Sequence, residues 1–140
     1  KKNCDEYFWN KHRKEARGVG GLFFDYCRET NENKIESWFE FVVNLGNKLM
    51  DPYIDIVKKR KNMSFTKNNL EWQQIRRGRY VEFNLIHDKG TIFGLKTNGR
   101  IESILVSMPP IAKWAYSWTP KKHSQEEKLL KILKKPINWL

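Results

Sequence analysis

The spacing of hydrophobic residues at the start of the chain changes from helical to strand-like. One face of a helix would carry Cys4, Tyr7, Phe8 and His12. We therefore expect a helix to about Ala16, with His12 on its inward stripe. The apolar run from Gly20 to Tyr26 is typical of a buried strand.

A capping box predicts the start of the longest helix, because Glu36 follows Asn33 at a spacing of three. The apolar face of this helix would carry Ile35, Trp38, Phe39, Val42, Leu45 and Leu49. Pro52 interrupts the pattern, since proline lacks a backbone donor and clashes with the preceding turn. We expect either a kink there or a new helix capped by Asp51.

The middle of the chain predicts a short helix followed by a β-hairpin. The helix would run from Lys67 to about Arg77 and end at Gly78. The segment 80–86 alternates, with Val81, Phe83 and Leu85 on one face, as in a strand. His87 to Gly90 would form the turn, and Thr91 to Leu95 the returning strand.

The last third predicts a loop, a short helix, an extended segment and a final helix. The loop would comprise Thr97 to Arg100. Its Asn-Gly pair is compatible with a hairpin turn. However, the apolar residues from Ile101 to Met108 have helical spacing, which favours a loop followed by a helix. The alternating Trp114, Tyr116 and Trp118 favour an extended segment, and Ser124 with Glu127 would cap a helix through Leu133. Residues 136–140 would form an apolar tail.

These elements predict an α+β fold: a large, mostly antiparallel sheet flanked by helical layers. At 140 residues the chain has the size of one domain, and we expect no internal boundary.

No apolar run reaches the roughly 18 residues of a membrane span, and no secretory signal opens the chain. Because the chain lacks an initiator Met, we expect a fragment.

The charge balance favours a polyanionic partner. Lys and Arg number 27 against 16 Asp and Glu, a net charge of +11. Such an excess suits nucleic acid, anionic lipid or a multiply carboxylated small molecule, although scattered lysines also simply solvate a surface. A basic nucleic-acid-binding module, with the run Arg76 to Tyr80 beside aromatic strands, is one alternative. Two cysteines are too few for a disulfide framework and favour a reducing compartment.

The segment from Arg17 to Asp25 has the composition of a functional site. Three glycines precede an aromatic run that ends on a carboxylate, and glycines this dense allow positive φ or close backbone approach. Arg13, Arg17 and Asp25 could line a pocket. Equally, an arginine could neutralise a buried aspartate. Both interpretations stay open at this point.

Long motifs along the chain resemble one known family. They are Lys1 to Phe8, Arg17 to Asp25, Arg76 to Leu85, Gly99 to Pro110, and Trp139-Leu140. In this order they closely resemble the signature of oxygen-dependent coproporphyrinogen III oxidases. The resemblance implies oxidative decarboxylation of two propionates of coproporphyrinogen III to vinyl groups, giving protoporphyrinogen IX in haem biosynthesis. It also implies the flat antiparallel sheet between helical layers.

The resemblance covers the C-terminal half of the family, and this limits what we expect of the chain. The family's proton-donor His and an Asn-x-Arg substrate contact lie upstream, so we expect no catalytic residue here and no turnover by the fragment alone. The resemblance implies a homodimer formed through roughly Tyr80 to Trp114; an isolated dimerisation module is a further alternative. It implies no membrane span, no nucleic acid, and a cytoplasmic enzyme or, alternatively, one of the mitochondrial intermembrane space.

The resemblance also implies specific site residues. Asn98, Gly99 and Arg100 match the family's substrate-contacting loop, and an Arg fork suits a propionate carboxylate. No cofactor is required, and O2 is the co-substrate. In some bacterial members the residue matching His12 is treated as a divalent-metal ligand, together with histidines upstream. A structural, hydrogen-bonding His12 is the alternative.

The chain departs from the family pattern at three positions. Asn3 replaces a usual Trp, Tyr26 replaces a second Asp, and Asn98 often corresponds to Gly. Tyr26 leaves Asp25 as the single carboxylate at the end of the apolar run. Asn98 keeps a residue that tolerates positive φ, so we expect the loop geometry to survive.

Overall fold

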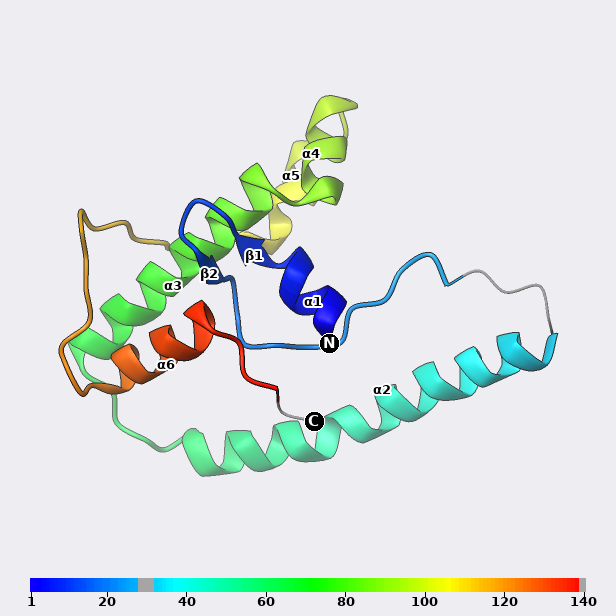
Figure 1. The fold of residues 1–140 in the computed structure, drawn as a ribbon, viewed down its shortest axis with the longest axis horizontal. Coiled ribbons are helices and arrows are strands. Elements are labelled where there is room, and N and C mark those ends of the chain that lie inside the picture. The colour runs from blue at the N-terminus through cyan, green and yellow to red at the C-terminus, as the bar shows by residue number, and fades with distance from the viewer. Residues whose placement is uncertain (28–31, 139–140) are drawn as a thin grey trace. The chain divides into compact units, whose positions relative to one another are not determined.

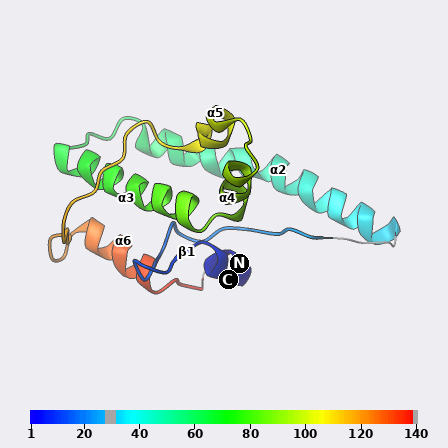
Figure 2. The ribbon, with the colours of Figure 1, turned by 90° about the horizontal axis from the view of Figure 1, so that it is seen from above.

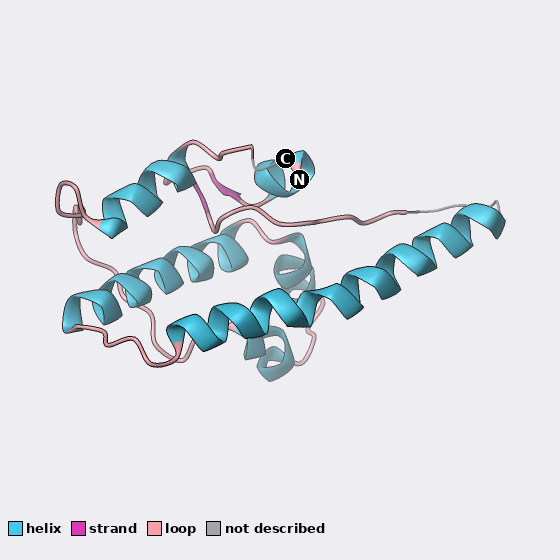
Figure 3. Ribbon diagram, turned by 90° about the horizontal axis from the view of Figure 1, so that it is seen from below, coloured by secondary structure: helices cyan, strands magenta, loops and turns pink. Residues whose placement is uncertain are grey.

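The computed structural model describes residues 1–27 and 32–138, which divide into two compact units. The first unit comprises Lys1–Phe23 with Thr66–Leu140, and the second comprises Phe24–Phe65. Regular structure in the described residues is mostly helical, with two short strands (Figure 3). The expectation of a single domain without a boundary stays a prediction.

The prediction of a large antiparallel sheet is wrong. In the described part of the chain, the sheet has two strands, β1 (Trp9–Asn10) and β2 (Glu15–Ala16), paired antiparallel. Where a β-hairpin was expected, at residues 80–95, the chain forms helices α3 (Lys67–Ile86) and α4 (Lys89–Lys96) (Figure 1). The fold is therefore helical, with a small hairpin against α3.

Helix α3 explains why the strand prediction failed. It begins as predicted, with Thr66 as N-cap in a capping box with Asn69. Asn84 and five further residues of the helix are buried, and these five follow helical spacing: Ile75, Gly78, Arg79, Glu82 and Phe83. Because two of these five are charged, hydropathy alone hides the helical stripe and leaves the alternation of apolar residues visible.

Gly78 lies inside α3 and does not end it. A Cβ atom at this position would lie 2.7 Å from the Lys113 carbonyl oxygen and 3.3 Å from the Trp114 ring. Glycine therefore allows the backbone of residues 113–114 to cross the helix closely. The glycine marks a close contact between segments.

The predicted turn at residues 87–90 lies at the right place, but it joins two helices. His87 is the C-cap of α3, and the Asp88 carboxylate caps α4 by accepting the Thr91 amide at 2.8 Å. Figures 1 and 2 show α4 at the C-terminal end of α3, and α5 (Ile101–Ile104) contacts α4. The predicted returning strand, Thr91 to Leu95, is thus wrong.

The first helix is shorter than predicted. α1 spans Lys2–Tyr7, and the chain then forms β1, a turn at residues 11–14 and β2. Lys14 has a φ of 52°, which a continuing helix does not allow. The fully buried Asn10 donates its side-chain amide to the Arg79 carbonyl at 3.1 Å and so holds the hairpin on α3. His12 therefore lies on a turn and not on an inward helical stripe.

The predicted strand from Gly20 to Tyr26 is absent from the described structure. Gly20 and Gly21 have φ values of 50° and 149°, and Tyr26 has a φ of 53°. Positive φ at three positions is incompatible with a regular strand. The glycines do adopt the positive φ that their density suggested.

The core of the first unit centres on α3. Phe83 and Ile75 are fully buried. The rings of Tyr7 and Phe8 lie 5.9 and 5.4 Å from the Phe83 ring, and Phe23 stacks on Tyr7. Aromatic residues that are distant in sequence thus form one cluster.

The two C-terminal helical predictions are confirmed. The short helix after the loop consists of α5 and the 3-10 turn η1 (Leu105–Ser107). Ser124 caps α6 (Gln125–Lys134) by accepting the Glu127 amide at 3.2 Å. The Glu127 side chain accepts from the His123 amide at 2.8 Å, one residue before the cap. The buried Leu133 of α6 adds to the core.

The second unit is built on α2 (Glu32–Arg60), with Pro52 inside the helix. A helix restarting at Asp51 is therefore the wrong alternative. The expected N-cap, Asn33, is already within α2, and its side chain lies outside the described part. Phe24 packs on Trp38 and Phe41 with ring distances of 5.8 and 5.6 Å. No helix in residues 1–27 and 32–138 has the length and apolarity needed to cross a membrane.

Candidate functional site

The predicted substrate loop is the C-terminal cap of α4. Asn98 has a φ of 56°, and the Gly99 amide donates to the Gly94 carbonyl at 3.0 Å. This pairing, across a left-handed residue, is a Schellman motif. A Cβ at Gly99 would lie 3.0 Å from that carbonyl oxygen and 3.0 Å from Ile104 Cδ1, so a side chain there would be tightly packed. Asn98 does adopt the positive φ that the sequence analysis allowed for it, while the survival of the family's loop geometry stays a prediction.

Arg100 leaves this turn with an exposed side chain. It is the N-cap residue of α5, with φ −64° and ψ 109°, and its side chain makes no capping hydrogen bond. Within the described ranges, no carboxylate forms an ion pair with its guanidinium. The five N–H donors of Arg100 are therefore available to an external acceptor.

His12 lies between two partners from α3 and its C-cap. Its Nε2 atom is 2.9 Å from Glu82 Oε2, and its Nδ1 atom is 3.2 Å from His87 Nε2. The side chain is 37% exposed. The hydrogen-bonding interpretation of His12 thus describes its position in this structure.

Glu82 is the centre of a group of side chains from three segments, which we call the Glu82 cluster. Its members are Glu82, His12, Arg13, Arg79 and Trp114. Arg13 donates from Nε and Nη2 at 3.0 and 2.7 Å, in a bidentate pair. Arg79 donates at 3.0 Å and Trp114 Nε1 at 2.8 Å. The carboxylate, only 9% exposed, is thus saturated with donors.

The cluster keeps Glu82 ionised. Burial alone would raise the pKa of this carboxyl, but hydrogen bonds from Arg13, His12 and Trp114 outweigh it and lower the pKa to about 2. Glu15 of β2, which is also buried, pairs with Arg76 and lies 3.7 Å from Arg79. Two buried carboxylates therefore bind the β1–β2 hairpin to α3.

Arg17 is held differently from Arg13. Its guanidinium carbon lies 4.3 Å from the centre of the Phe8 ring and 4.8 Å from that of Tyr80, and it donates to Asn84 Oδ1 at 3.1 Å. Burial lowers the pKa of Arg17. Asp25 is exposed and belongs to the second unit. Arg13 is therefore paired with the carboxylate of Glu82, whereas Arg17 packs against aromatic rings.

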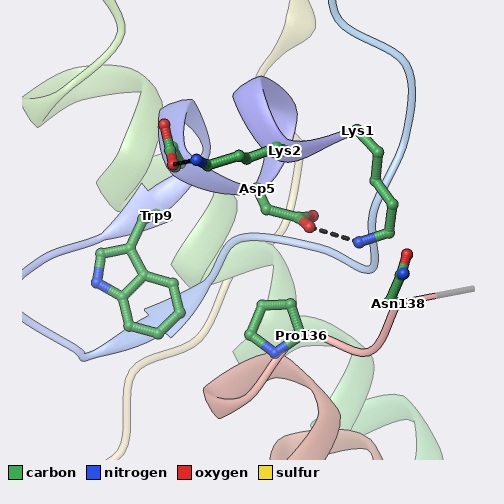
Figure 4. Close-up of a pocket in the computed structure, with 7 residues that line it drawn as sticks. Lys1, Lys2, Asp5, Trp9, Pro136 and Asn138 are labelled. Carbon is green, nitrogen blue, oxygen red and sulfur yellow. Dashed lines mark hydrogen bonds and ion pairs between the residues drawn. The ribbon is translucent and has the colours of Figure 1, made fainter.

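An open cavity lies elsewhere in the first unit. It has a volume of about 770 Å³ and is bounded by α1, Trp9 and the segment around Pro136 (Figure 4). Its charges are paired, with Lys1 Nζ 2.6 Å from Asp5 Oδ2. None of the predicted site residues lines this cavity.

The sequence interpretation missed the residues that surround His12 and Arg13. Glu82, Arg79, Arg76 and Glu15 were not recognised as buried charges. A signal was present, since Arg76, Arg79 and Glu82 recur every three residues and would share one face of a helix. Interpreting that segment as a strand separated them.

Comparison with known proteins gives a family. A sequence model described as coproporphyrinogen III oxidase matches residues 1–139. The oxygen-dependent coproporphyrinogen-III oxidase of Francisella philomiragia subsp. philomiragia is 53% identical over 140 residues, which are 100% of this chain and 44% of the relative. The protein of the same name from Francisella tularensis subsp. tularensis (strain SCHU S4) is also 53% identical, with the same coverage.

The match covers only a part of these relatives. The chain spans 44% of their length and corresponds to their C-terminal part. The expectation that the sequence resembles a C-terminal half is therefore confirmed. The chain belongs to the coproporphyrinogen III oxidase family.

Proposed function

We propose that this chain supplies the substrate-anchoring part of an oxygen-dependent coproporphyrinogen III oxidase. The family match along residues 1–139 is the observation that carries the proposal. In this function, two propionates of coproporphyrinogen III become vinyl groups. Each loses CO2, a proton and two electrons, and O2 accepts the electrons.

The conformation of the loop at residues 98–100 supports its role as an anchor. The Schellman turn fixes the backbone before Arg100, while the guanidinium keeps all its donors available. A fixed backbone with an unpaired Arg suits the binding of a carboxylate through two parallel hydrogen bonds. The substrate carries four such carboxylates, and Arg100 would hold one of them.

We place the chemistry of the reaction largely in the substrate. A reduced tetrapyrrole is electron-rich and can react with O2 itself, so the protein holds, orients and shields it. The proton donor would come from the region that precedes the matched part in the relatives. No turnover is therefore expected from these 140 residues alone, and no organic cofactor is invoked.

The homodimer is part of the same proposal. Several exposed apolar side chains belong to the predicted interface: Leu85, Ile86, Phe93, Leu95, Ile101, Val106, Ile111 and Trp114. A subunit interface could cover such side chains. Because the relatives are bacterial, the cytoplasm is the compartment that we propose.

The nucleic-acid alternative loses its main support. It relied on aromatic strands that could stack bases, but residues 80–86 are helical and Phe83 is completely buried. The excess of basic residues remains compatible with a multiply carboxylated porphyrin.

The proposal is tested by binding of coproporphyrin III, the stable oxidised form of the substrate's ring system, followed by quenching of its fluorescence. We expect saturable binding that Arg100→Ala weakens at least tenfold. The matched control is Arg60→Ala, which removes the same charge from another exposed position and should leave the affinity within twofold. Equal losses in both variants would show a non-specific charge effect and contradict the proposal.

A further inference from the structure

The cavity between α1, Trp9 and the segment around Pro136, which we call the terminal cavity, is formed by two regions far apart in the sequence (Figure 4). One wall comes from residues 1–9, and the other from Pro136 and Asn138, which follow α6. Its volume of about 770 Å³ lies in the range of roughly 300–1,000 Å³ that is typical of binding pockets. The terminal cavity has no part in the proposed propionate anchor, because residues 98–100 do not line it.

The charged side chains of the terminal cavity are already paired with one another. Lys1 Nζ lies 2.6 Å from Asp5 Oδ2, and Lys2 Nζ lies 3.9 Å from Glu6 Oε1. Two positive and two negative side chains leave the lining without a net charge that would attract an ion. The half-buried Trp9 ring and the exposed Pro136 provide apolar surface. We therefore expect an apolar occupant.

Further apolar side chains extend this surface beyond the terminal cavity. A small neighbouring pocket shares Lys1, Asp5 and Pro136 with it and is also lined by Val19 and Ile137. Val19 and Ile137 are both exposed. Apolar side chains grouped in this way at the surface are typical of a contact with another polypeptide segment.

The position of Lys1 indicates which segment this is. Lys1 lines the terminal cavity, and the chain matches the C-terminal part of the Francisella relatives, 44% of their length. In these relatives the polypeptide therefore continues upstream from the position that matches Lys1. Ten extended residues span at most about 33–36 Å, so a segment attached at this position can reach across a cavity of this volume. Attachment also gives the segment an effective concentration in the millimolar range, an advantage that no free partner has.

We propose that the terminal cavity is the docking site for the segment that immediately precedes the matched part in these relatives, with apolar side chains of that segment packed against Trp9 and Pro136. Tryptophan is among the side chains that contribute most to such contacts, and proline loses almost no side-chain entropy when it is covered. The docked segment would hold α1 and residues 136–138 together and so fix where the upstream polypeptide leaves this unit. The inference uses the family match and not the propionate anchor.

The proposal is tested with an extended chain, in which the roughly 15 residues that precede the match in the Francisella philomiragia relative are attached to Lys1. The control has a scrambled extension of the same composition. The rate at which a broad-specificity protease cleaves the extension reports the fraction of molecules in which the extension is undocked. We expect the native extension to be cleaved at least tenfold more slowly than the scrambled one. Equal rates, or protection that rises with protein concentration and so indicates a second copy, would overturn the proposal.

Matched variants of the extended chain locate the contact. Trp9→Ala removes the ring, and Pro136→Asp places a charge on an exposed part of the apolar wall; each should speed cleavage of the native extension at least tenfold. Pro110→Asp, the same substitution at another exposed proline, should change the rate less than twofold. Circular dichroism verifies the folding of each variant, and Pro136→Asp decides the result if Trp9→Ala unfolds. Protection that persists in both variants would overturn the proposal. Porphyrin binding is measured separately, so either proposal can fail alone.

Discussion

The Glu82 cluster and the loop at residues 98–100 use arginine in opposite ways. In the cluster, Arg13 and Arg79 surround one buried carboxylate and have their charge satisfied inside the protein. In the loop, the backbone is fixed by a helix cap while the Arg100 side chain remains unpaired in the described structure. Charges that are already satisfied stabilise the fold, whereas an unpaired Arg on a rigid turn can bind a ligand.

Removal of Glu82 should have the largest effect on stability. Glu82→Ala leaves Arg13 and Arg79 without their shared carboxylate, and breaking a buried ion pair costs about 3–5 kcal/mol. Urea unfolding followed by circular dichroism measures the change. Arg100→Ala is the comparison variant, and a similar loss in both would erase the distinction between the two regions.

Acid should weaken the cluster within a defined pH window. The pKa of Glu82 is lowered from 4.5 to about 2 in the folded protein, so its contribution is fully present above about pH 4.5. That contribution is lost as the pH falls from about 4.5 towards 2, because the unfolded chain then takes up a proton that the folded Glu82 still lacks. Unfolding free energies between pH 6 and 3 should fall more steeply in the parent protein than in Glu82→Gln. If the unfolding free energies of the two proteins fall equally with pH, the pairing of ionised Glu82 with its donors is contradicted.

Gly78→Ala should be destabilising, by about 1–3 kcal/mol, because the added methyl group would meet the Lys113 carbonyl at 2.7 Å. Gly46 in α2 is the matched control, since a Cβ there has no atom within 4 Å. Gly46→Ala should stabilise its helix by up to about 1 kcal/mol. If both substitutions raise the free energy of unfolding measured in urea, the close crossing of residues 113–114 over α3 is contradicted.

Asn98→Ala should cost about 1 kcal/mol, because alanine is strained at a φ of 56°. Asn98→Gly should be neutral or slightly stabilising, since glycine adopts this conformation freely. The difference between the two variants, measured by thermal unfolding, isolates the backbone effect from loss of the amide. Equal stabilities would show that the turn does not depend on left-handed backbone.

These two regions also differ in how well the sequence predicted them. The loop was predicted because its signals are local: Asn98 tolerates positive φ, and the apolar residues after Arg100 have helical spacing. The Glu82 cluster was missed because its members come from three segments and its charges are buried. Arg79 and Glu82 lie on the inward face of α3, where hydropathy patterns expect apolar residues, so the segment was interpreted as a strand.

The same reasoning explains the other errors in the fold. The helix expected to reach Ala16 ends at Tyr7, because Asn10 and Glu15 make tertiary contacts with α3 that no local pattern contains. By contrast, Ser124 and Thr66 mark helix starts through hydrogen bonds to residues three positions away, and both starts lie where the sequence indicated. The starts of α3 and α6 were therefore predicted reliably, whereas the apolar patterns at residues 20–26 and 80–86, both interpreted as strands, were not.

Arg100→Ala should change stability least, by less than about 0.5 kcal/mol, because the side chain is exposed and unpaired. We expect this substitution to weaken ligand binding instead. The most direct measurement compares the affinities of the parent chain and Arg100→Ala for a porphyrin with four carboxylates and for one with two. We predict that the parent prefers the tetracarboxylate and that Arg100→Ala loses most of this preference. An unchanged preference would contradict the assignment of Arg100 as a propionate anchor.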